Sequence, residues 1–189
     1  RYCARGGPVS ERERVRAERT AAFFGLYGEL SSQSGFEKIG QYAQHGSTTR
    51  LVHSVAVAYY SYRLAFFLGL SFHARDLVRG ALLHDYFLYD AQDGDPAHKG
   101  HWTRHPEIAL ENAGKDLPLT AIEADVIRKH MFPLTHQPPR YRESVVVAII
   151  DKGCAVYEFF CRRQPYAKLR RAMGERTWRP VRLLPLPED

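Results

Sequence analysis

The sequence predicts an all-α fold in a single domain. The chain has 189 residues, of which 44% are hydrophobic and 25% are charged, as is usual for one soluble globular domain. Apolar residues recur every three or four positions in several segments, and the period-two alternation of a half-exposed strand is absent. The longest apolar run, residues 145–150, is far shorter than the ~20 residues of a membrane span. We therefore expect a bundle of helices and no membrane partner.

Capping signals place the first two helices. Ser10 and Glu13 have the spacing of a capping box, which predicts a helix that runs to about Leu30. Ser34 and Glu37 repeat this spacing and predict a second, short helix. In each box the serine side chain would accept one of the backbone N–H groups that a helix start leaves unpaired.

Two further helices are expected in the next part of the chain. The first follows Ser47 and ends near Leu68, where Gly69 can cap it because glycine adopts the left-handed conformation without strain. The second covers residues 72–84 and is preceded by Ser71.

Glycine, proline and aspartate then mark residues 87–104 as a loop. Pro106 suits the first position of the next helix, since its missing N–H would be unpaired there in any case. That helix would run to about Asn112, with Gly114 beyond its end.

Two more helices complete the prediction. Thr120 and Glu123 form a third capping box, and their helix would end near His130. The last helix covers residues 141–160. From Gln164 onward, prolines and scattered arginines show no period, so we expect an extended or poorly ordered tail.

We divide the chain into N-terminal helices (residues 1–44), a core (residues 45–160) and a basic, proline-containing tail (residues 161–189). The net charge of +6 comes from the two ends, because residues 21–160 contain thirteen basic and fifteen acidic side chains. A body without excess positive charge does not predict a groove for duplex nucleic acid. Three cysteines without a CxxC pair are typical of a reducing compartment, so we expect a cytoplasmic protein.

Histidines and aspartates of the predicted helices form a candidate metal site. They come from five different helices or helix ends, with His84 and Asp85 together at one of them, as in metal sites of helical bundles. The candidates are His53, His84, Asp85, His105, His130 and Asp151. A single histidine on an apolar face is more often a hydrogen-bonded core residue than a ligand. Asp151 is different, because a carboxylate inside an apolar helix is rarely buried without a partner.

The order of these residues resembles the HD superfamily of metal-dependent phosphohydrolases. The resemblance covers roughly residues 45–160. It rests on His53, on the sequence Leu82-Leu83-His84-Asp85 and on Asp151 in a late helix. It implies an HD-domain-like helical bundle that hydrolyses a phosphate ester or phosphoanhydride of a nucleotide-like small molecule with a metal-activated hydroxide.

His105, which precedes a proline, and His130 resemble ligands of the dinuclear members, among them the HD-GYP cyclic di-GMP phosphodiesterases. The resemblance implies two divalent cations that share Asp85, with His53, His84 and Asp151 on the first and His105 and His130 on the second. Iron or manganese suits these ligands best, and magnesium, cobalt, nickel and zinc are compatible. The Gly-Tyr-Pro motif is absent and Met131 stands where a second histidine is usual, which argues against cyclic di-GMP as the substrate.

Basic residues near the candidate ligands are candidate phosphate contacts. We favour Lys152, which directly follows Asp151, and assign catalytic roles to Lys152 and to Asp85 as the shared ligand. The further substrate-binding candidates are Arg50, Lys99, Arg104 and Lys129. Two other interpretations stay open. In one, a mononuclear enzyme uses His105 and His130 only to contact phosphate, and in the other a regulatory module binds metal or nucleotide without turnover.

The other histidines receive weaker roles. His101 is the substitute ligand if His105 is not one, and with His98 it would line the mouth of the site. We expect the rest on the surface: His45, His73 and His136. The flanking aromatic residues would close the end of the bundle, which we favour, or stack on a nucleobase: Tyr86, Phe87, Tyr89 and Trp102. The sequence is also compatible with a homodimer through residues 166–178.

Overall fold

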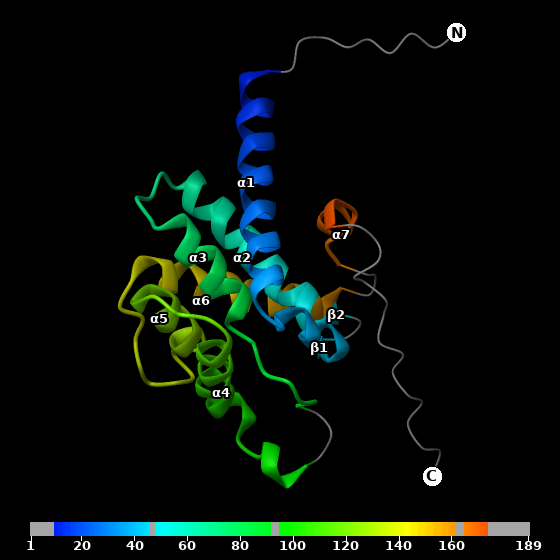
Figure 1. Ribbon diagram of the computed structural model, residues 1–189, viewed down its shortest axis with the longest axis vertical. Coiled ribbons are helices and arrows are strands. Elements are labelled where there is room, and N and C mark those ends of the chain that lie inside the picture. The colour runs from blue at the N-terminus through cyan, green and yellow to red at the C-terminus, as the bar shows by residue number, and fades with distance from the viewer. Residues whose placement is uncertain (1–9, 46–47, 92–94, 162–164, 174–189) are drawn as a thin grey trace, which may run out of the picture.

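The computed structural model describes residues 10–45, 48–91, 95–161 and 165–173. Its elements are α1 (Glu11–Gln33), the 3-10 helix η1 (Phe36–Gln41), β1 (Ala43–His45), β2 (Thr48–Thr49), α2 (Arg50–Phe67), α3 (Ala74–Leu83), the 3-10 helix η2 (Pro96–His98), α4 (His101–Asp116), α5 (Ala121–Lys129), α6 (Arg142–Phe160) and α7 (Ala167–Met173) (Figure 1). The prediction of an all-α domain is confirmed. Among the described helices, none combines the length and the hydropathy that crossing a membrane requires.

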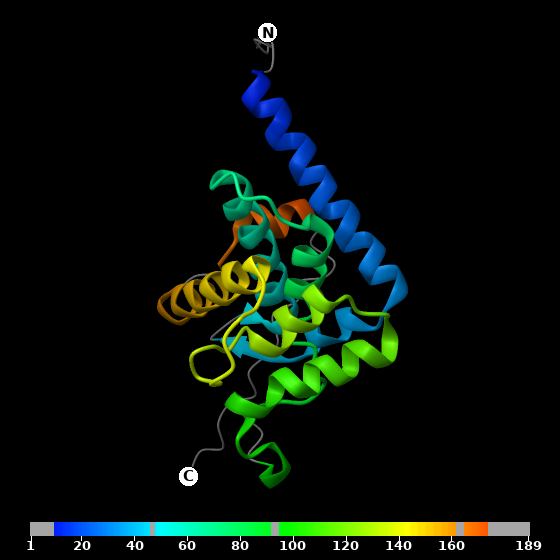
Figure 2. The same cartoon turned by 90° about the vertical axis from the view of Figure 1, so that its left-hand side faces the viewer.

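The central helix of the bundle is α2. It packs against α3 and α6, while α5 contacts both α3 and α6, and α4 packs on α5 (Figures 1 and 2). Twelve of the 18 residues of α2 are buried. A helix that is covered on most sides must be apolar or small on most faces, which explains why its sequence lacks a clear polar stripe.

The first helix buries side chains in the core only through its second half, although Arg19 in the first half lies over the ring of Phe66 at 4.2 Å. The Ser10 side chain accepts the N–H of Glu13, and the Glu13 carboxylate accepts the N–H of Ser10, which confirms the predicted capping box. The buried residues Phe23 and Leu30 attach the second half to the core. The first half carries no buried residue and projects from the body of the molecule (Figures 1 and 2).

Two other predicted helix ends are confirmed. Thr120 and Glu123 form the capping box at the start of α5. Gly69 has a φ of 63° just after α2. There the N–H of Leu70 bonds to the carbonyl of Ala65, which closes the helix end as expected for a left-handed cap.

The predicted capping box of Ser34 and Glu37 is wrong. Ser34 ends α1 instead, and its hydroxyl donates to the carbonyl of Leu30. Glu37 accepts from the hydroxyls of Tyr27 and Ser31 rather than from a helix start. A short helix is present, but it is the 3-10 helix η1, which begins after Gly35 without a side-chain cap.

The start of α2 is also later than predicted. Ser47 lies outside the described residues, and the cap is Thr49, whose side chain accepts the N–H of Val52. The residues before it form an antiparallel hairpin of β1 and β2. Strands of three and two residues are too short to show an alternating pattern, so the sequence did not predict them. The hairpin carries Gln44 and His45 to the centre of the molecule.

Helix α4 begins earlier and ends later than predicted. It starts at His101, so Pro106 is inside the helix rather than at its first position, and it continues through Gly114. The early start has a consequence for the site. His101 and His105 lie four residues apart on one face, and their rings stack with centroids 4.7 Å apart.

The expected tail is partly folded. Residues 165–173 contain α7, and Pro165, Tyr166 and Leu169 are buried against the core. The remainder of the predicted tail, residues 174–189, lies outside the described residues. Burial of apolar side chains, which the irregular spacing of this segment did not reveal, orders the part next to α6.

A single glycine sets the contact between α3 and α5. A Cβ atom on Gly80 would lie 2.9 Å from Cβ of Val126, a fully buried residue. We expect Gly80→Ala to lower the free energy of unfolding by about 1–3 kcal/mol, because the two helices would have to separate. The control is Gly28→Ala on the exposed side of α1, where the added methyl meets nothing within 4 Å. It should raise the free energy of unfolding by about 0.5–1 kcal/mol. Urea denaturation measures both, and equal stabilities would contradict the close contact.

Candidate metal centre

All six predicted ligands meet at the centre of the bundle. His53 comes from α2, His84 and Asp85 from the end of α3, His105 from α4, His130 from the end of α5 and Asp151 from α6. None of the six is more than 7% exposed. Helices that cross in the core therefore place imidazoles and carboxylates within a few ångströms of one another.

Four donor atoms gather on one side of Asp85. Its Oδ2 atom lies 3.9 Å from Nε2 of His53 and 3.4 Å from Nε2 of His84. The Oδ1 atom of Asp151 lies 3.0 Å and 3.5 Å from the same two nitrogens. We call His53, His84, Asp151 and Oδ2 of Asp85 the His53 group.

The other oxygen of Asp85 faces a second pair of histidines. Oδ1 lies 3.2 Å from Nε2 of His105 and 3.6 Å from Nε2 of His130. The two Nε2 atoms lie 2.9 Å from each other. We call His105, His130 and this oxygen the His105 group. Asp85 thus stands between the two groups and presents one oxygen to each.

The outward nitrogens of three histidines are fixed by backbone carbonyls of their own helices. These pairs are His84 Nδ1 with Ala81 at 2.7 Å, His105 Nδ1 with His101 at 3.1 Å and His130 Nδ1 with Ile127 at 2.8 Å. A carbonyl only accepts, so each Nδ1 carries a proton and Nε2 is the nitrogen that faces the centre. This arrangement is the usual support of a histidine that binds a metal.

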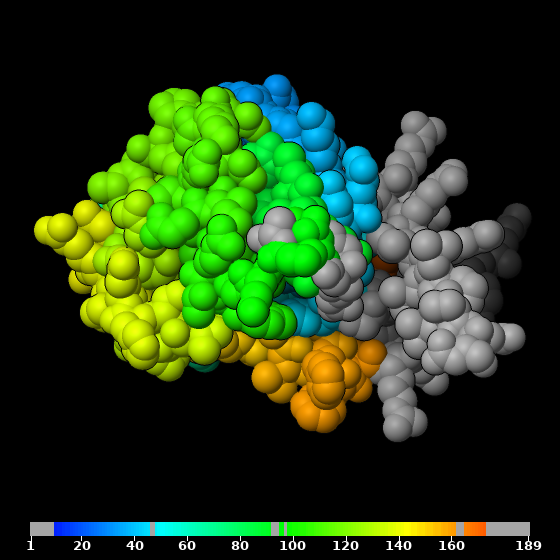
Figure 3. All heavy atoms as spheres, turned by 90° about the horizontal axis from the view of Figure 1, so that it is seen from below, coloured from blue at the N-terminus to red at the C-terminus, as the bar shows by residue number. Residues whose placement is uncertain are grey.

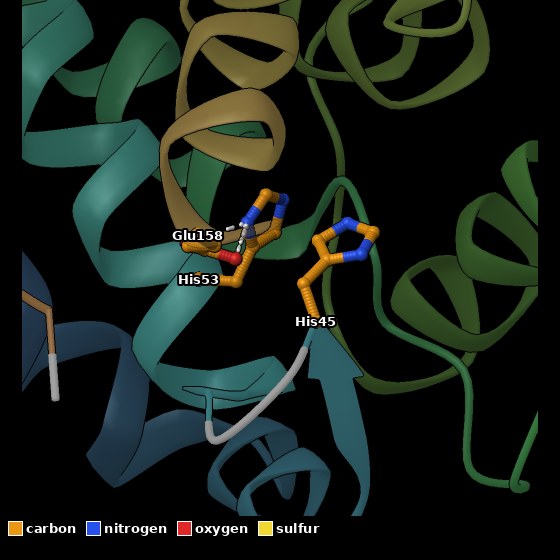
Figure 4. Close-up of side chains that lie close together, drawn as sticks. All are labelled: His45, His53 and Glu158. Atoms are coloured by element: carbon orange, nitrogen blue, oxygen red, sulfur yellow. Dashed lines mark hydrogen bonds and ion pairs between the residues drawn. The ribbon is translucent and has the colours of Figure 1, made fainter. Parts of the chain in front are cut away.

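Glu158 supports the fourth histidine, and sequence reasoning missed it. Nδ1 of His53 lies 3.1 Å from both carboxylate oxygens of Glu158, which is 2% exposed (Figure 4). Glu158 follows Asp151 by seven residues on α6, so both carboxylates lie on the same face of the helix. This seven-residue spacing was the feature of the sequence from which Glu158 could have been predicted to lie near the site.

Two observations test whether a cation fits. Among the described residues, Nε2 of His84 and Oδ1 of Asp85 are buried without a hydrogen-bond partner. In addition, Nε2 of His105 lies 2.9 Å from Nε2 of His130 while both Nδ1 atoms are paired with carbonyls, so the two facing nitrogens need a proton or a cation between them. Nitrogen and carboxylate donors without thiolate are suitable ligands for divalent transition metals. These buried histidine and aspartate groups could hold a metal ion.

The pKa values describe the same centre in electrostatic terms. Burial lowers the pKa of His84, but the neighbouring carboxylates of Asp85 and Asp151 outweigh burial and raise it to about 9. Burial raises the pKa of Asp151, but the imidazoles of His53 and His84 hold it well below its usual range. Burial, with His84 and His105 nearby, lowers the pKa of His130 to about 3. Ionised carboxylates and a neutral His130 are the forms that bind a metal.

A cavity of about 380 Å³ opens onto the centre. Four of the candidate ligands line it: Asp85, His105, His130 and Asp151. The described residues that form the rest of its wall are Gln44, His45, His101, Trp102, Met131, Pro133, Leu134, Lys152 and Ala155. Seen from below, the green atoms of the segment around the start of α4 lie next to the orange atoms of the end of α6 (Figure 3).

Of the predicted phosphate contacts, Lys152 lines this cavity. Its Nζ atom donates to the carbonyl of His130 at 2.7 Å and to that of Ala148 at 3.2 Å. An ammonium carries three N–H groups, so one remains for a ligand.

The other predicted phosphate contacts do not belong to the wall formed by the described residues. Lys129 is paired with Asp125 at 2.6 Å. Arg104 donates to the carbonyl of Lys99 in the exposed loop.

Arg50 is a structural residue rather than a phosphate contact. It is fully buried, with Nη1 donating to the carbonyls of Phe87 and Tyr89 and its guanidinium 3.5 Å from the centre of the Phe87 ring. Its Nε atom donates to Gln44, and Gln44 in turn donates to Oδ2 of Asp85 at 2.6 Å. The prediction that Arg50 lies close to the ligands is confirmed. The sequence could not show that Arg50 contacts Asp85 through Gln44, away from the cavity.

The other histidines are divided between the cavity and the surface. The expectation that His45 is a surface residue is wrong, because the β1–β2 hairpin places it in the cavity wall, 5.6 Å from the ring of His53 (Figure 4). His101 also lines the cavity, with Nδ1 bonded to the hydroxyl of Tyr89. His73 and His136 are exposed, as expected. His98 stacks on Tyr89, outside the cavity wall described above.

The flanking aromatic residues have two different roles. Tyr86 and Phe87 are buried and close the end of the bundle, as the favoured interpretation has it. Trp102 is 61% exposed and lies in the cavity wall.

Comparison with known proteins does not indicate a function for this chain. No family model and no curated protein matches this chain. The chemistry of the centre therefore follows from its donor atoms and their supports.

The structural role of Arg50 is testable. We expect Arg50→Met to lower the free energy of unfolding by about 2–4 kcal/mol, because it leaves buried carbonyls without their charged donor. Arg63→Met is the control, since Arg63 is exposed on the same helix, and it should change stability by less than about 0.5 kcal/mol. Chemical denaturation measures both variants. An Arg50→Met protein of unchanged stability would contradict this role.

Proposed function

We propose that this protein is a metal-dependent phosphohydrolase of the HD type with two divalent cations. The observation that carries the proposal is the position of Asp85, whose two oxygens face two separate groups of histidine nitrogens. One carboxylate between two sets of donors is the arrangement that a shared ligand requires.

Each group would hold one cation. The first would bind His53, His84, Asp85 and Asp151, and the second would bind Asp85 together with the other two histidines. Iron or manganese suits these nitrogen and carboxylate donors best. When bound, two cations lower the pKa of water and offset the negative charge of a phosphoryl group.

The residues of the chain itself orient the substrate. Lys152 offers its remaining N–H to a phosphate oxygen in the cavity, while the carbonyls of His130 and Ala148 hold its ammonium in place. Met131, Pro133 and Leu134 add an apolar part to the wall of the same cavity.

The cavity is suited to a nucleotide-like small molecule. A volume of about 380 Å³ is at the lower end of ordinary ligand pockets, which suits a small phosphate ester better than a long polyphosphate. Trp102 can stack on a base, and such a contact contributes ~1–3 kcal/mol.

The donor geometry favours this proposal over the mononuclear alternative. In that alternative His105 and His130 contact phosphate, and each would need a proton on Nε2. Both rings already donate from Nδ1 to a carbonyl, and the pKa of His130 is lowered to about 3 by burial and by His84 and His105. A neutral His130 of this tautomer offers phosphate a lone pair, which is repulsive.

Metal stoichiometry tests the dinuclear centre. Purified protein loaded with manganese or iron should contain close to two equivalents per chain by elemental analysis. His105→Ala should lose about one equivalent, because the second cation would keep only two protein ligands. His136→Ala, an exposed control, should retain both. One equivalent in the wild-type protein that survives His105→Ala would support the mononuclear alternative instead.

Phosphate release tests the enzyme. With manganese present, we expect hydrolysis of at least one member of a panel of nucleotides. Lys152→Met should lower kcat/KM by about 10²-fold, the usual loss when one charge-stabilising donor is removed. Lys99→Met changes an exposed lysine outside the cavity wall and should leave kcat/KM unchanged. A protein that binds metal and nucleotide but releases no phosphate would be the regulatory module, and the enzyme proposal would fail.

A further inference from the structure

A residue beyond the region of HD resemblance reaches the metal centre. Tyr166 lies just before α7, in the segment that the sequence predicts to be a tail, and it is 8% exposed. Its hydroxyl donates to Oε1 of Glu158 at 2.9 Å. Glu158 is the carboxylate that accepts the Nδ1 proton of His53.

The three residues form a continuous chain of buried hydrogen bonds. It runs from the hydroxyl of Tyr166 to the Glu158 carboxylate and then to the imidazole of His53. The far nitrogen of that ring, Nε2, faces Asp151 at 3.0 Å. Two hydrogen bonds therefore separate Tyr166 from a ring whose donor atom points into the His53 group.

Tyr166 restricts the movement of the carboxylate that contacts His53. Both oxygens of Glu158 lie 3.1 Å from Nδ1 of His53. The Tyr166 hydroxyl holds one of them, Oε1, from the other side. Partners of this kind orient a metal-binding histidine and set the basicity of its donor nitrogen.

The backbone at Tyr166 is held in a strained conformation. Its φ is 60°, in the left-handed region that residues other than glycine rarely adopt. Its ring lies between those of Tyr60 and Tyr157, with centroids at 5.8 Å and 5.4 Å. Strain of this kind persists where the surroundings fix a residue, and it is common next to functional sites.

We propose that Tyr166 is a positioning residue for the metal centre, which acts through Glu158 to orient His53 and so sets the affinity of the His53 group for its cation. This inference rests on the proposed metal centre. It also makes residues 165–173 part of the support of the site, although they lie outside the region that carries its ligands.

The variant Tyr166→Phe removes the hydroxyl and keeps the ring. We expect one of the two cations to bind about three- to tenfold more weakly, less than the 10–100-fold typical when a direct partner of a ligand is lost. Competition with a chelator measures the affinity for manganese. The visible spectrum of the cobalt-substituted protein reports the ligand geometry, and it should change in the same variant.

Tyr157→Phe is the matched control. Tyr157 lies on α6 beside Tyr166 and is 50% exposed, and its variant removes a hydroxyl from the same aromatic cluster without touching the Glu158 hydrogen bonds. Affinity and spectrum should equal those of the wild-type protein. Equal losses in both variants would indicate a general packing effect and would overturn the proposal.

A double variant tests the route through Glu158. Glu158→Ala alone should weaken cation binding by about 10–100-fold. Adding Tyr166→Phe to it should cause no further loss, because the hydroxyl then has no side chain at position 158 to orient. Additive losses would overturn the route.

Different results would contradict the role of Tyr166 and the metal centre. Unchanged affinity and spectrum in Tyr166→Phe would overturn the role of Tyr166 and leave the metal centre intact. A wild-type protein that binds no cation would overturn both.

Discussion

Burial of two carboxylates in the middle of a helical bundle is the constraint on which the rest of this structure depends. Asp85 and Asp151 are almost completely removed from water, and an ionised carboxylate in such a place requires compensating positive charge. Four imidazoles surround the pair. Their donor nitrogens point inward, and a cation between them would satisfy both kinds of group at once.

The fold orients the four imidazoles by hydrogen bonds from their Nδ1 atoms, which face away from the two carboxylates. His84 and His130 both end a helix and both donate to the carbonyl three residues earlier, so one local geometry is used twice. Asp85 is held from a different direction, by the amide of Gln44 in the hairpin, which the buried Arg50 supports. Elements that are far apart in the chain therefore determine where the donor atoms lie.

The residues that line the cavity differ from the buried residues that hold them in place. The cavity wall combines donor atoms, one ammonium and an apolar part, and the proposed binding of a small phosphate ester depends on these groups. Behind the wall, Glu158 and Tyr166 extend the network of the centre to the last described helix. The segment next to α7 is thereby linked to the centre more closely than its composition indicates.

The sequence by itself determined the helical fold, most helix ends and all six candidate ligands. The capping boxes at Ser10 and Thr120 are local signals, because the bonded atoms lie within one turn, and an ionisable residue in an apolar helix is conspicuous without any partner. Only the tertiary structure decided the roles of Gln44, Arg50 and Tyr166. Their hydrogen-bond partners lie 6 to 41 residues away along the chain. No local pattern records which distant side chain a folded chain will bring into contact.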